Sequence, residues 1–438
     1  MTEPDRSQTA TTSPPPSRLS LVEYTRIATV HAHAAALLRT CISPWGLAAS
    51  GDRGGYHNLW ARDAMITALG ALATEDSELH DAVERSLHSL AAHQESRGCI
   101  PNKIDFTDPP RVNFRAYGDG SLWFVLIAAR FARRFPDRDT SDLLSAADRA
   151  LEFTRYQDQD GGGLVTIQEG ASWMDLFPLR GKTTYINTLR YYATSELAET
   201  RSSHGEVAAF DTLANEAAHI RAMVNEKLWY EPGKDRARII QDSFSTSSYD
   251  AAGYDALGRK LLLPEKRILR EDAYFLPYQT LRHFGEWFDS FGNLLAIESG
   301  LASTEQQTAI LDFMERHSLA APYPVRAIHP AQYPGDPDWR EYFHFGDLNL
   351  PDQYHNGGCW PLLGGFYVRA LTRTGRTDAA ATALAQLAAA NAAPGADGFA
   401  FSEYLHGATG TPSGMADQAW SAGMFLAACE AFFETSPV

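Results

Sequence analysis

The stretch AWSAGMFLAACEAFF, residues 419–433, has apolar or small side chains on nearly every face of the helix that its pattern predicts. Residues 380–391, AATALAQLAAAN, share this all-round character. A helix without a polar face is surrounded by other parts of a protein. The chain is therefore expected to enclose one set of helices within another, and both segments are assigned to the inner set.

Helical patterns extend from these segments over most of the chain. In residues 183–200, Ile186, Leu189, Ala193 and Leu197 recur at the spacing of one helix face. Twelve candidate helices are indicated, several in close pairs, near residues 20–40, 61–74, 77–96, 119–135, 140–155, 183–200, 203–228, 291–301, 304–317, 357–374, 376–392 and 417–433. Six pairs predict an all-α fold, an (α/α)6 barrel or six-hairpin toroid.

Ordered structure is expected to begin near Ser20, which stands in capping-box register with Glu23. The polar, proline-rich residues 1–18 predict a disordered tail and lack the apolar stretch of a signal peptide. Residues 230–290 are the least helical and predict a loop excursion with short strands over one rim. Residues 19–438 are thus interpreted as a single barrel domain.

Charge and cysteine content narrow the classes of partner. The formal net charge of −16 over 438 residues argues against a nucleic-acid groove and against binding to an anionic membrane surface. The four cysteines are Cys41, Cys99, Cys359 and Cys429, and they are scattered along the chain without the spacing of metal ligands. This pattern predicts neither a disulfide framework nor a structural metal, and it favours a location in the reducing cytoplasm. Small neutral or cationic molecules are the expected partners, and the sequence leaves homo-oligomerisation open.

Polar and aromatic residues gather in the breaks between the predicted helices, where loops on a rigid scaffold carry function. Three carboxylates stand there in aromatic settings: Asp63 beside Trp60 and Arg62, Asp175 beside Trp173, and Glu403 between Phe401 and Tyr404. Aromatic faces stack on sugar rings, and charged groups bind sugar hydroxyls. Hydrolysis of a glycosidic bond requires one protonated and one ionised carboxyl group, so this pattern indicates a glycosidase.

Asp175 lies in the segment ASWMDLFP, residues 171–178, between bulky apolar neighbours. Desolvation by Trp173, Met174, Leu176 and Phe177 would raise its pKa and keep it protonated at neutral pH. The alternative is that Asp175 caps the helix that follows.

Several longer motifs resemble a known family. They are SFGNLLAIESGLASTEQQTAILDFMER (290–316), YHNGGCWPLL (354–363), FSEYLHGATG (401–410), ADQAWSAGMFL (416–426) and YGDGSLWFVLIA (117–128). In these motifs the chain resembles the alkaline/neutral invertases, cytosolic (α/α)6-barrel glycoside hydrolases. It is more distantly similar to the glucosidase domain of glycogen debranching enzymes.

The resemblance implies an inverting hydrolysis with Asp175 as general acid and Glu403 as general base, without metal or organic cofactor. Inversion places the two carboxyl groups roughly 6.5–9.5 Å apart. The substrate-binding residues that the motifs imply are Trp60, Arg62, Asp63, Asp119, Trp173, His355, Asn356, Tyr404, Gln418 and Trp420. The expected partner is a small carbohydrate.

Around the acid the chain departs from the invertases. Its SWMDLFPLRGK is nearer to the Trp-Met-Asp of the debranching-type glucosidases. The expected substrate is therefore a small α-glucoside, either sucrose-like or a terminal α-linked glucose. Two alternatives stay open, a sugar isomerase or epimerase on the same barrel and a catalytically inactive carbohydrate-binding protein.

Residues 158–169, DQDGGGLVTIQE, partly match the sequence template of a calcium-binding loop. The fifth position is Gly162 where a ligating side chain is expected, so a plain connecting loop is favoured over an ion site.

Overall fold

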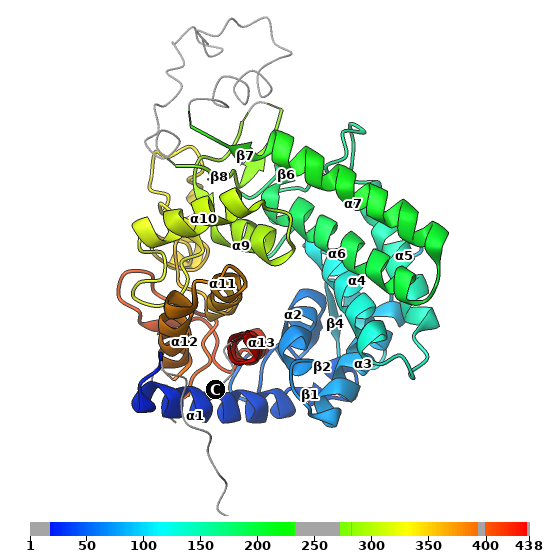
Figure 1. Cartoon of the computed structure of the whole chain (residues 1–438), viewed down its shortest axis with the longest axis horizontal. Coiled ribbons are helices and arrows are strands. Elements are labelled where there is room, and N and C mark those ends of the chain that lie inside the picture. The colour runs from blue at the N-terminus through cyan, green and yellow to red at the C-terminus, as the bar shows by residue number, and fades with distance from the viewer. Residues whose placement is uncertain (1–17, 233–271, 282, 393–398, 436–438) are drawn as a thin grey trace, which may run out of the picture.

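The computed structural model describes residues 18–232, 272–281, 283–392 and 399–435. Within these ranges, twelve α-helices alternate along the chain between an inner and an outer ring (Figure 1). The inner ring consists of α2 (Ala61–Ala71), α4 (Tyr117–Arg134), α6 (Thr184–Ser203), α9 (Ser290–Glu298), α11 (Pro361–Arg373) and α13 (Ala419–Thr435). The outer ring consists of α1 (Leu21–Thr40), α3 (Ser77–Ala92), α5 (Ser141–Arg155), α7 (Val207–Lys227), α10 (Thr304–Arg316) and α12 (Thr377–Asn391).

The inner helices close into a ring because each contacts two others, in the order α2, α4, α6, α9, α11, α13 and back to α2. Every residue of α2 and of α9 is buried. The predicted (α/α)6 barrel is confirmed, and each of the twelve expected helices is present. The capping box is present too: Ser20 Oγ accepts from the Glu23 N–H at 3.3 Å, and Glu23 Oε2 accepts from the Ser20 N–H at 2.8 Å.

One of the two segments assigned to the inner ring lies elsewhere. Residues 419–433 belong to the inner helix α13, as expected, but residues 380–391 belong to α12, which lies in the outer ring (Figure 1). α12 is nevertheless largely buried because it contacts α1, α11 and α13. Its alanine-rich surface allows neighbouring helices to approach from several sides, and this is why its sequence resembles that of an inner helix.

Very short strands lead into several inner helices. β3 (Leu59–Trp60) pairs with β4 (Lys103–Asp105), and β4 pairs with β5 (Arg111–Asn113). The other pairs are β1 (Ile42–Ser43) with β2 (Gly46–Leu47), β6 (Lys182–Thr183) with β9 (Tyr278–Gln279), β7 (Trp229–Tyr230) with β8 (Tyr274–Phe275), β10 (Phe288–Asp289) with β11 (Ile328–His329), and β12 (Tyr404–Leu405) with β13 (Pro412–Ser413). β3, β6 and β10 end directly before α2, α6 and α9, so they fix where these helices begin.

Two of the predicted segments lie largely outside the described residues. The structure does not describe residues 1–17 of the expected tail or residues 233–271 of the expected loop excursion. The described flanks of the excursion contain the short strands β7, β8, β9 and β10. Among the described helices, none is long and apolar enough to cross a membrane.

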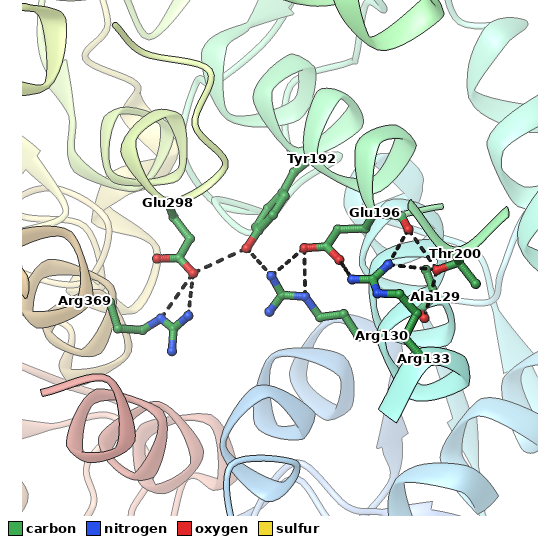
Figure 2. Close-up of polar contacts among 8 residues, drawn as sticks. All are labelled: Ala129, Arg130, Arg133, Tyr192, Glu196, Thr200, Glu298 and Arg369. Atoms are coloured by element: carbon green, nitrogen blue, oxygen red, sulfur yellow. Dashed lines mark hydrogen bonds and ion pairs between the residues drawn. The ribbon is translucent and has the colours of Figure 1, made fainter. Parts of the chain in front are cut away.

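A polar network joins four inner helices toward their C-terminal ends (Figure 2). Glu298 of α9 accepts from Arg369 of α11 at 2.6 Å and from the Tyr192 hydroxyl of α6 at 3.3 Å. Tyr192 also bonds to Arg130 of α4, which donates to Glu196 of α6 at 2.7 Å. This charge network, defined here by Arg130, Tyr192, Glu196, Glu298 and Arg369, ties the inner ring together at one end of the barrel.

Candidate active site

The expected site residues lie at the other end of the barrel, where the inner helices begin. Arg62, Asp63 and Asp119 are in the first turns of α2 and α4. The remainder lie in or beside the segments that precede inner helices: Trp60 before α2, Trp173 and Asp175 before α6, His355 and Asn356 before α11, and Glu403, Tyr404 and Gln418 before α13, with Trp420 in its first turn. Residues from segments far apart in the sequence thus share one end of the ring.

Three carboxyl groups interact electrostatically at this end. Burial raises the pKa of Glu403 to about 7, and the negative charges of Asp63 and Asp175 add to this increase. Burial likewise raises the pKa of Asp63 to about 6, and the opposing charge of Arg62 only partly offsets it. Nearby negative charges disfavour ionisation, so Asp63 and Asp175 act on Glu403 and Asp175 acts on Asp63; we call these three groups the carboxyl cluster.

Arg62 is the cation of this cluster. Its Nη1 donates to Asp119 Oδ2 at 3.1 Å, and its Nε lies 3.9 Å from Asp63 Oδ2. Asp119 is fully buried and also accepts from the Tyr185 hydroxyl at 3.1 Å. Trp123 Nε1 in turn donates to that hydroxyl at 2.9 Å. Asp119 therefore fixes the position of Arg62, which leaves Arg62 Nε directed toward Asp63.

The surroundings of Asp175 differ from the expectation. Trp173, Met174 and Phe177 are buried in the core, but Asp175 itself is solvent-accessible and Leu176 is 39% exposed. The apolar neighbours therefore anchor the turn without enclosing the carboxyl group. Desolvation nevertheless raises the pKa of Asp175, and the charge of Arg62 opposes this increase.

Asp175 does not cap a helix. It lies in a turn well before α6, and the cap of α6 is Thr183, whose Oγ1 accepts from the Ile186 N–H at 3.2 Å. The capping alternative is therefore wrong for Asp175.

Glu403 is held by two segments. Its Oε2 accepts from the Met415 N–H at 3.0 Å, and its own N–H donates to the Met415 carbonyl at 2.8 Å. The Tyr354 side chain also acts on the carboxylate. Both interactions lower the pKa of Glu403, opposite to the effect of burial, because they favour the ionised form.

Aromatic rings from the segments before α6, α11 and α13 pack against one another at this end of the barrel. His355 stacks on Trp360 with centroids 5.3 Å apart and meets Trp173 edge-on at 5.1 Å. Tyr354 packs on His355 at 4.0 Å and on Tyr404 at 5.4 Å. Burial holds the pKa of His355 well below its ordinary value, so this ring is neutral at physiological pH.

Several polar atoms at this end are buried and have no hydrogen-bond partner among the described residues. They are the indole Nε1 atoms of Trp60, Trp173 and Trp420, Arg62 Nε, both ring nitrogens of His355 and both amide atoms of Gln418. Buried polar groups in folded proteins are nearly always paired, by ordered water or a ligand when not by protein. This concentration of unpaired donors suits a ligand rich in hydroxyl groups.

Asn356 differs from the other expected binding residues. Its Oδ1 accepts from the Gln332 N–H at 2.6 Å, and its Nδ2 donates to the carbonyls of Gln332 and Asn349, each at 2.9 Å. With its amide occupied by main-chain contacts, Asn356 braces the loop before α11. We therefore expect it to shape the site without contacting a ligand.

Sequence reasoning missed two tyrosines. The carboxylates of Glu403, Asp63 and Asp175 all act on Tyr56, whose pKa is raised by burial first and then by these charges. Tyr354 is affected in the same way by burial, Glu403 and Asp175. Both stand in a Tyr-His-Asn triplet, at residues 56–58 and 354–356, and this repeat ahead of two inner helices was the available signal.

The calcium-like segment uses its carboxylates within the protein. Asp158 accepts from the N–H groups of Gly162 and Gly163 at 3.1 and 2.8 Å, and Lys182 Nζ donates to Asp160 at 2.5 Å. The described residues contain no group of three or more His, Cys, Asp or Glu side chains arranged to hold a metal ion. An open hollow of about 990 Å³ lies beside this segment, but the expected site residues do not line it.

Comparisons with known proteins agree with the architecture. The mannosylglycerate hydrolase from Thermus thermophilus, solved in complex with glucose, matches with a TM-score of 0.63 and 14% identity over 91% of this chain and 99% of that chain. A bacterial glucoamylase complexed with acarbose matches with a TM-score of 0.58 and 14% identity over 94% of this chain and 56% of that chain. At these identities the similarity shows the fold alone.

Curated relatives are plant proteins. Alkaline/neutral invertase E, chloroplastic, of Arabidopsis thaliana is 25% identical over 56% of this chain and 41% of its own length. Neutral/alkaline invertase 1, mitochondrial, of Oryza sativa subsp. japonica is 29% identical over 61% of this chain and 43% of its own length. The chain thus spans well under half the length of these relatives. Residues 115–434 match the family described as alkaline and neutral invertase, and the chain belongs to that family.

Proposed function

We propose that this protein is a glycoside hydrolase that cleaves a small α-glucoside with inversion at the anomeric carbon. The observation that supports this most is that Asp63, Asp175 and Glu403, from three separate segments, lie at one end of the barrel with raised pKa values, and that Asp63 and Asp175 act on the charge of Glu403. Such a cluster provides the protonated and ionised carboxyl groups that glycoside hydrolysis requires. Family membership supports the same chemistry.

Two of these groups, Asp175 and Glu403, act on protons in the proposed reaction. Asp175 donates its proton to the glycosidic oxygen as the bond to the anomeric carbon breaks. Glu403 accepts a proton from a water molecule, whose oxygen bonds to the anomeric carbon from the opposite face. Glucose leaves as the β-anomer together with the free alcohol, and a proton passing from Glu403 to solvent and from solvent to Asp175 restores the starting state.

Glu403 is proposed as the base although its pKa is itself raised to about 7. The Met415 N–H donates to Glu403 and favours its charged form. At Asp175, burial and Asp119 raise the pKa, whereas Arg62 and a backbone hydrogen bond lower it. The roles of base and acid are assigned from the motifs that the chain shares with the invertases. A base with this pKa becomes active as pH rises through neutrality.

The charge of the site favours a neutral substrate. Among the described residues of the carboxyl cluster and its two charged neighbours there are four acidic groups, Asp63, Asp119, Asp175 and Glu403, and one cation, Arg62. An anionic leaving group would be repelled in such surroundings. Uncharged α-glucosides such as sucrose or a terminal α-linked glucose fit this field.

The other candidate functions have less support. An isomerase on this barrel would use histidine bases, yet His355 is fully buried and His406 accepts main-chain N–H groups through Nδ1. A purely binding protein has no need of coupled carboxyl groups with raised pKa values. The four cysteines, all free and buried, are consistent with a reducing compartment such as the cytoplasm.

Sugar release from a panel of substrates tests this proposal. The purified protein is incubated with sucrose, maltose, isomaltose, trehalose, kojibiose and glucosylglycerol, and Glu403→Gln serves as the inactive reference. We expect hydrolysis of at least one neutral α-glucoside by the parent protein and loss of that activity in the variant. Binding of these sugars without turnover, or their isomerisation without water addition, would contradict the proposal.

A further inference from the structure

The turn that carries Asp175 is closed by main-chain contacts. The Phe177 N–H donates to the Met174 carbonyl at 3.2 Å. Gly170 has a φ of 79°, and a side chain at its position would come within 2.9 Å of the Asp175 carbonyl oxygen. Asp175 itself is exposed, so the place of its carboxyl group depends on the backbone of this turn.

Phe177 anchors the turn in the core. Its ring stacks on the Phe343 ring with centroids 5.1 Å apart and meets the Trp287 ring edge-on at 5.4 Å. Phe343 is fully buried and belongs to the 3-10 helix η2 (Glu341–Asp347). The segment that contains η2 therefore packs against the turn of Asp175.

Asn349 follows η2 and joins this turn to the loop before α11. Its Nδ2 donates to the Leu176 carbonyl at 2.9 Å, and its Oδ1 accepts from the His355 N–H at 3.1 Å. Its main-chain carbonyl accepts from Asn356 Nδ2, also at 2.9 Å. The Asn349 side chain is buried, so solvent does not readily replace these partners. One amide thus links the residue next to Asp175 with the loop of His355.

We propose that Asn349 is a positioning residue that holds the turn of Asp175 against the His355 loop and so directs the Asp175 carboxyl group at the glycosidic oxygen. The inference rests on the proposed role of Asp175 as general acid. Proton transfer depends on close placement of the acid, and a displacement of about 1 Å can cost about 10²-fold in rate. Asn349 acts through the backbone of the turn and transfers no proton itself.

The test is Asn349→Leu, which fills a similar volume without hydrogen bonds, together with the smaller Asn349→Ala. For each variant, kcat/KM is measured on α-glucosyl fluoride, whose leaving group departs without a proton, and on the neutral α-glucoside that the substrate panel identifies. Both values come from one sample, so their ratio does not depend on the fraction of folded protein. An amide that served stability alone would leave this ratio unchanged.

The same two substitutions at Asn293 of α9 are the matched controls. Asn293 is also fully buried, and its Nδ2 donates to the carbonyls of Phe275 and Asp289 at 3.0 and 2.9 Å. Its Oδ1 accepts from the Phe275 N–H at 3.0 Å. Asn293 therefore bridges two segments as Asn349 does, but none of these hydrogen bonds reaches the turn of Asp175. Asp175→Asn is the reference for loss of the acid.

In both Asn349 variants we expect kcat/KM on the glucoside to fall about 10- to 100-fold more than kcat/KM on the fluoride. The Asn293 variants should lower both values by the same factor. Equal losses on the two substrates in the Asn349 variants, with a selective loss in Asp175→Asn, would overturn the inference and leave the proposed function intact. Equal losses in Asp175→Asn as well would show that Asp175 is not the acid, and would contradict both.

Discussion

Asp175 and Glu403 differ in the contacts that decide their protonation. Glu403 accepts a hydrogen bond from the Met415 N–H, whereas Asp175 lies at an exposed turn where burial and Asp119 raise its pKa and Arg62 lowers it. The two residues should therefore respond differently to substitution when the leaving group is varied. This difference separates the acid from the base without any assumption about the natural substrate.

Asp175→Asn should lose on the order of 10²–10⁴ in rate on an ordinary α-glucoside, because it cannot protonate the leaving oxygen. It should retain far more activity on α-glucosyl fluoride, since fluoride departs without a proton. Glu403→Gln should fail on both substrates, because water must be activated in each. Steady-state kinetics of the two variants on the two substrates makes the comparison, and equal losses on the fluoride would show that the roles are misassigned.

Asp63→Asn should move the acid limb of the rate profile to lower pH. The negative charge of Asp63 raises the pKa of Glu403, so its removal makes the base easier to ionise. A pH profile of kcat/KM checks this shift, and an upward or absent shift would mean that Asp63 and Glu403 are not coupled in the working enzyme.

At the scale of the element, the inner helices could be predicted and the loops before them could not. Periodic apolar residues identified all twelve helices. The start of α11 was misplaced, because the pattern predicted it near residue 357, whereas the helix begins at Pro361, a residue that favours the first turn. Left-handed residues precede several inner helices, at Ala116, Asp352, Tyr354, Phe401 and Asp417. These conformations are imposed by tertiary contacts, so local sequence carries no signal for them. The position of Tyr354 in the site depends on such a loop.

The buried carboxyl group of Asp289, which caps α9, should make the stability of the protein depend on pH. Its Oδ1 accepts from the Phe291 N–H at 3.1 Å, yet complete burial raises its pKa to about 7. A pKa raised in the folded state means that the folded protein holds the proton more tightly. The contribution of Asp289 to stability is thus fully present below the unfolded pKa near 4 and is lost as pH rises toward 7.

Asp289→Asn keeps a capping side chain without the charge. The free energy of unfolding of the variant minus that of the parent should rise between pH 4 and 8, by no more than about 4 kcal/mol. Urea unfolding at several pH values measures this difference. Asp76→Asn at the cap of α3 is the control: hydrogen bonds from Arg39 and the Leu79 N–H outweigh burial and lower the pKa of Asp76, so its difference should stay flat above roughly pH 5 and change, with the opposite sign, only below roughly pH 4. If the difference in unfolding free energy between Asp289→Asn and the parent did not change with pH, the raised pKa of Asp289 would be contradicted.

At the scale of the whole molecule, the two ends of the barrel have different tasks. The carboxyl cluster lies where the inner helices begin, and the charge network joins α4, α6, α9 and α11 toward their ends (Figure 2). The network was not predicted, because its members are spread over four helices and each appears in the sequence as an ordinary charged or polar residue. Its position indicates a role in holding the ring closed while the other end performs chemistry.

Glu298→Gln should lower the free energy of unfolding by about 3 kcal/mol, because it leaves Arg369 largely buried beside a neutral partner. Turnover at low temperature should persist, since the site lies at the opposite end. Asp312→Asn is the control, because it breaks an accessible ion pair with Arg376 and should cost less than about 1 kcal/mol. Equal losses of stability in the two variants would show that the network does not hold the ring together.

The stereochemistry of hydrolysis tests the central proposal most directly. Proton NMR recorded during the first minutes of hydrolysis of an α-glucoside identifies the anomer of glucose that forms before mutarotation. If Asp175 acts as acid while Glu403 directs water to the opposite face, β-glucose must appear first. Initial release of α-glucose would show that the mechanism retains configuration, and it would contradict the roles proposed for both carboxyl groups.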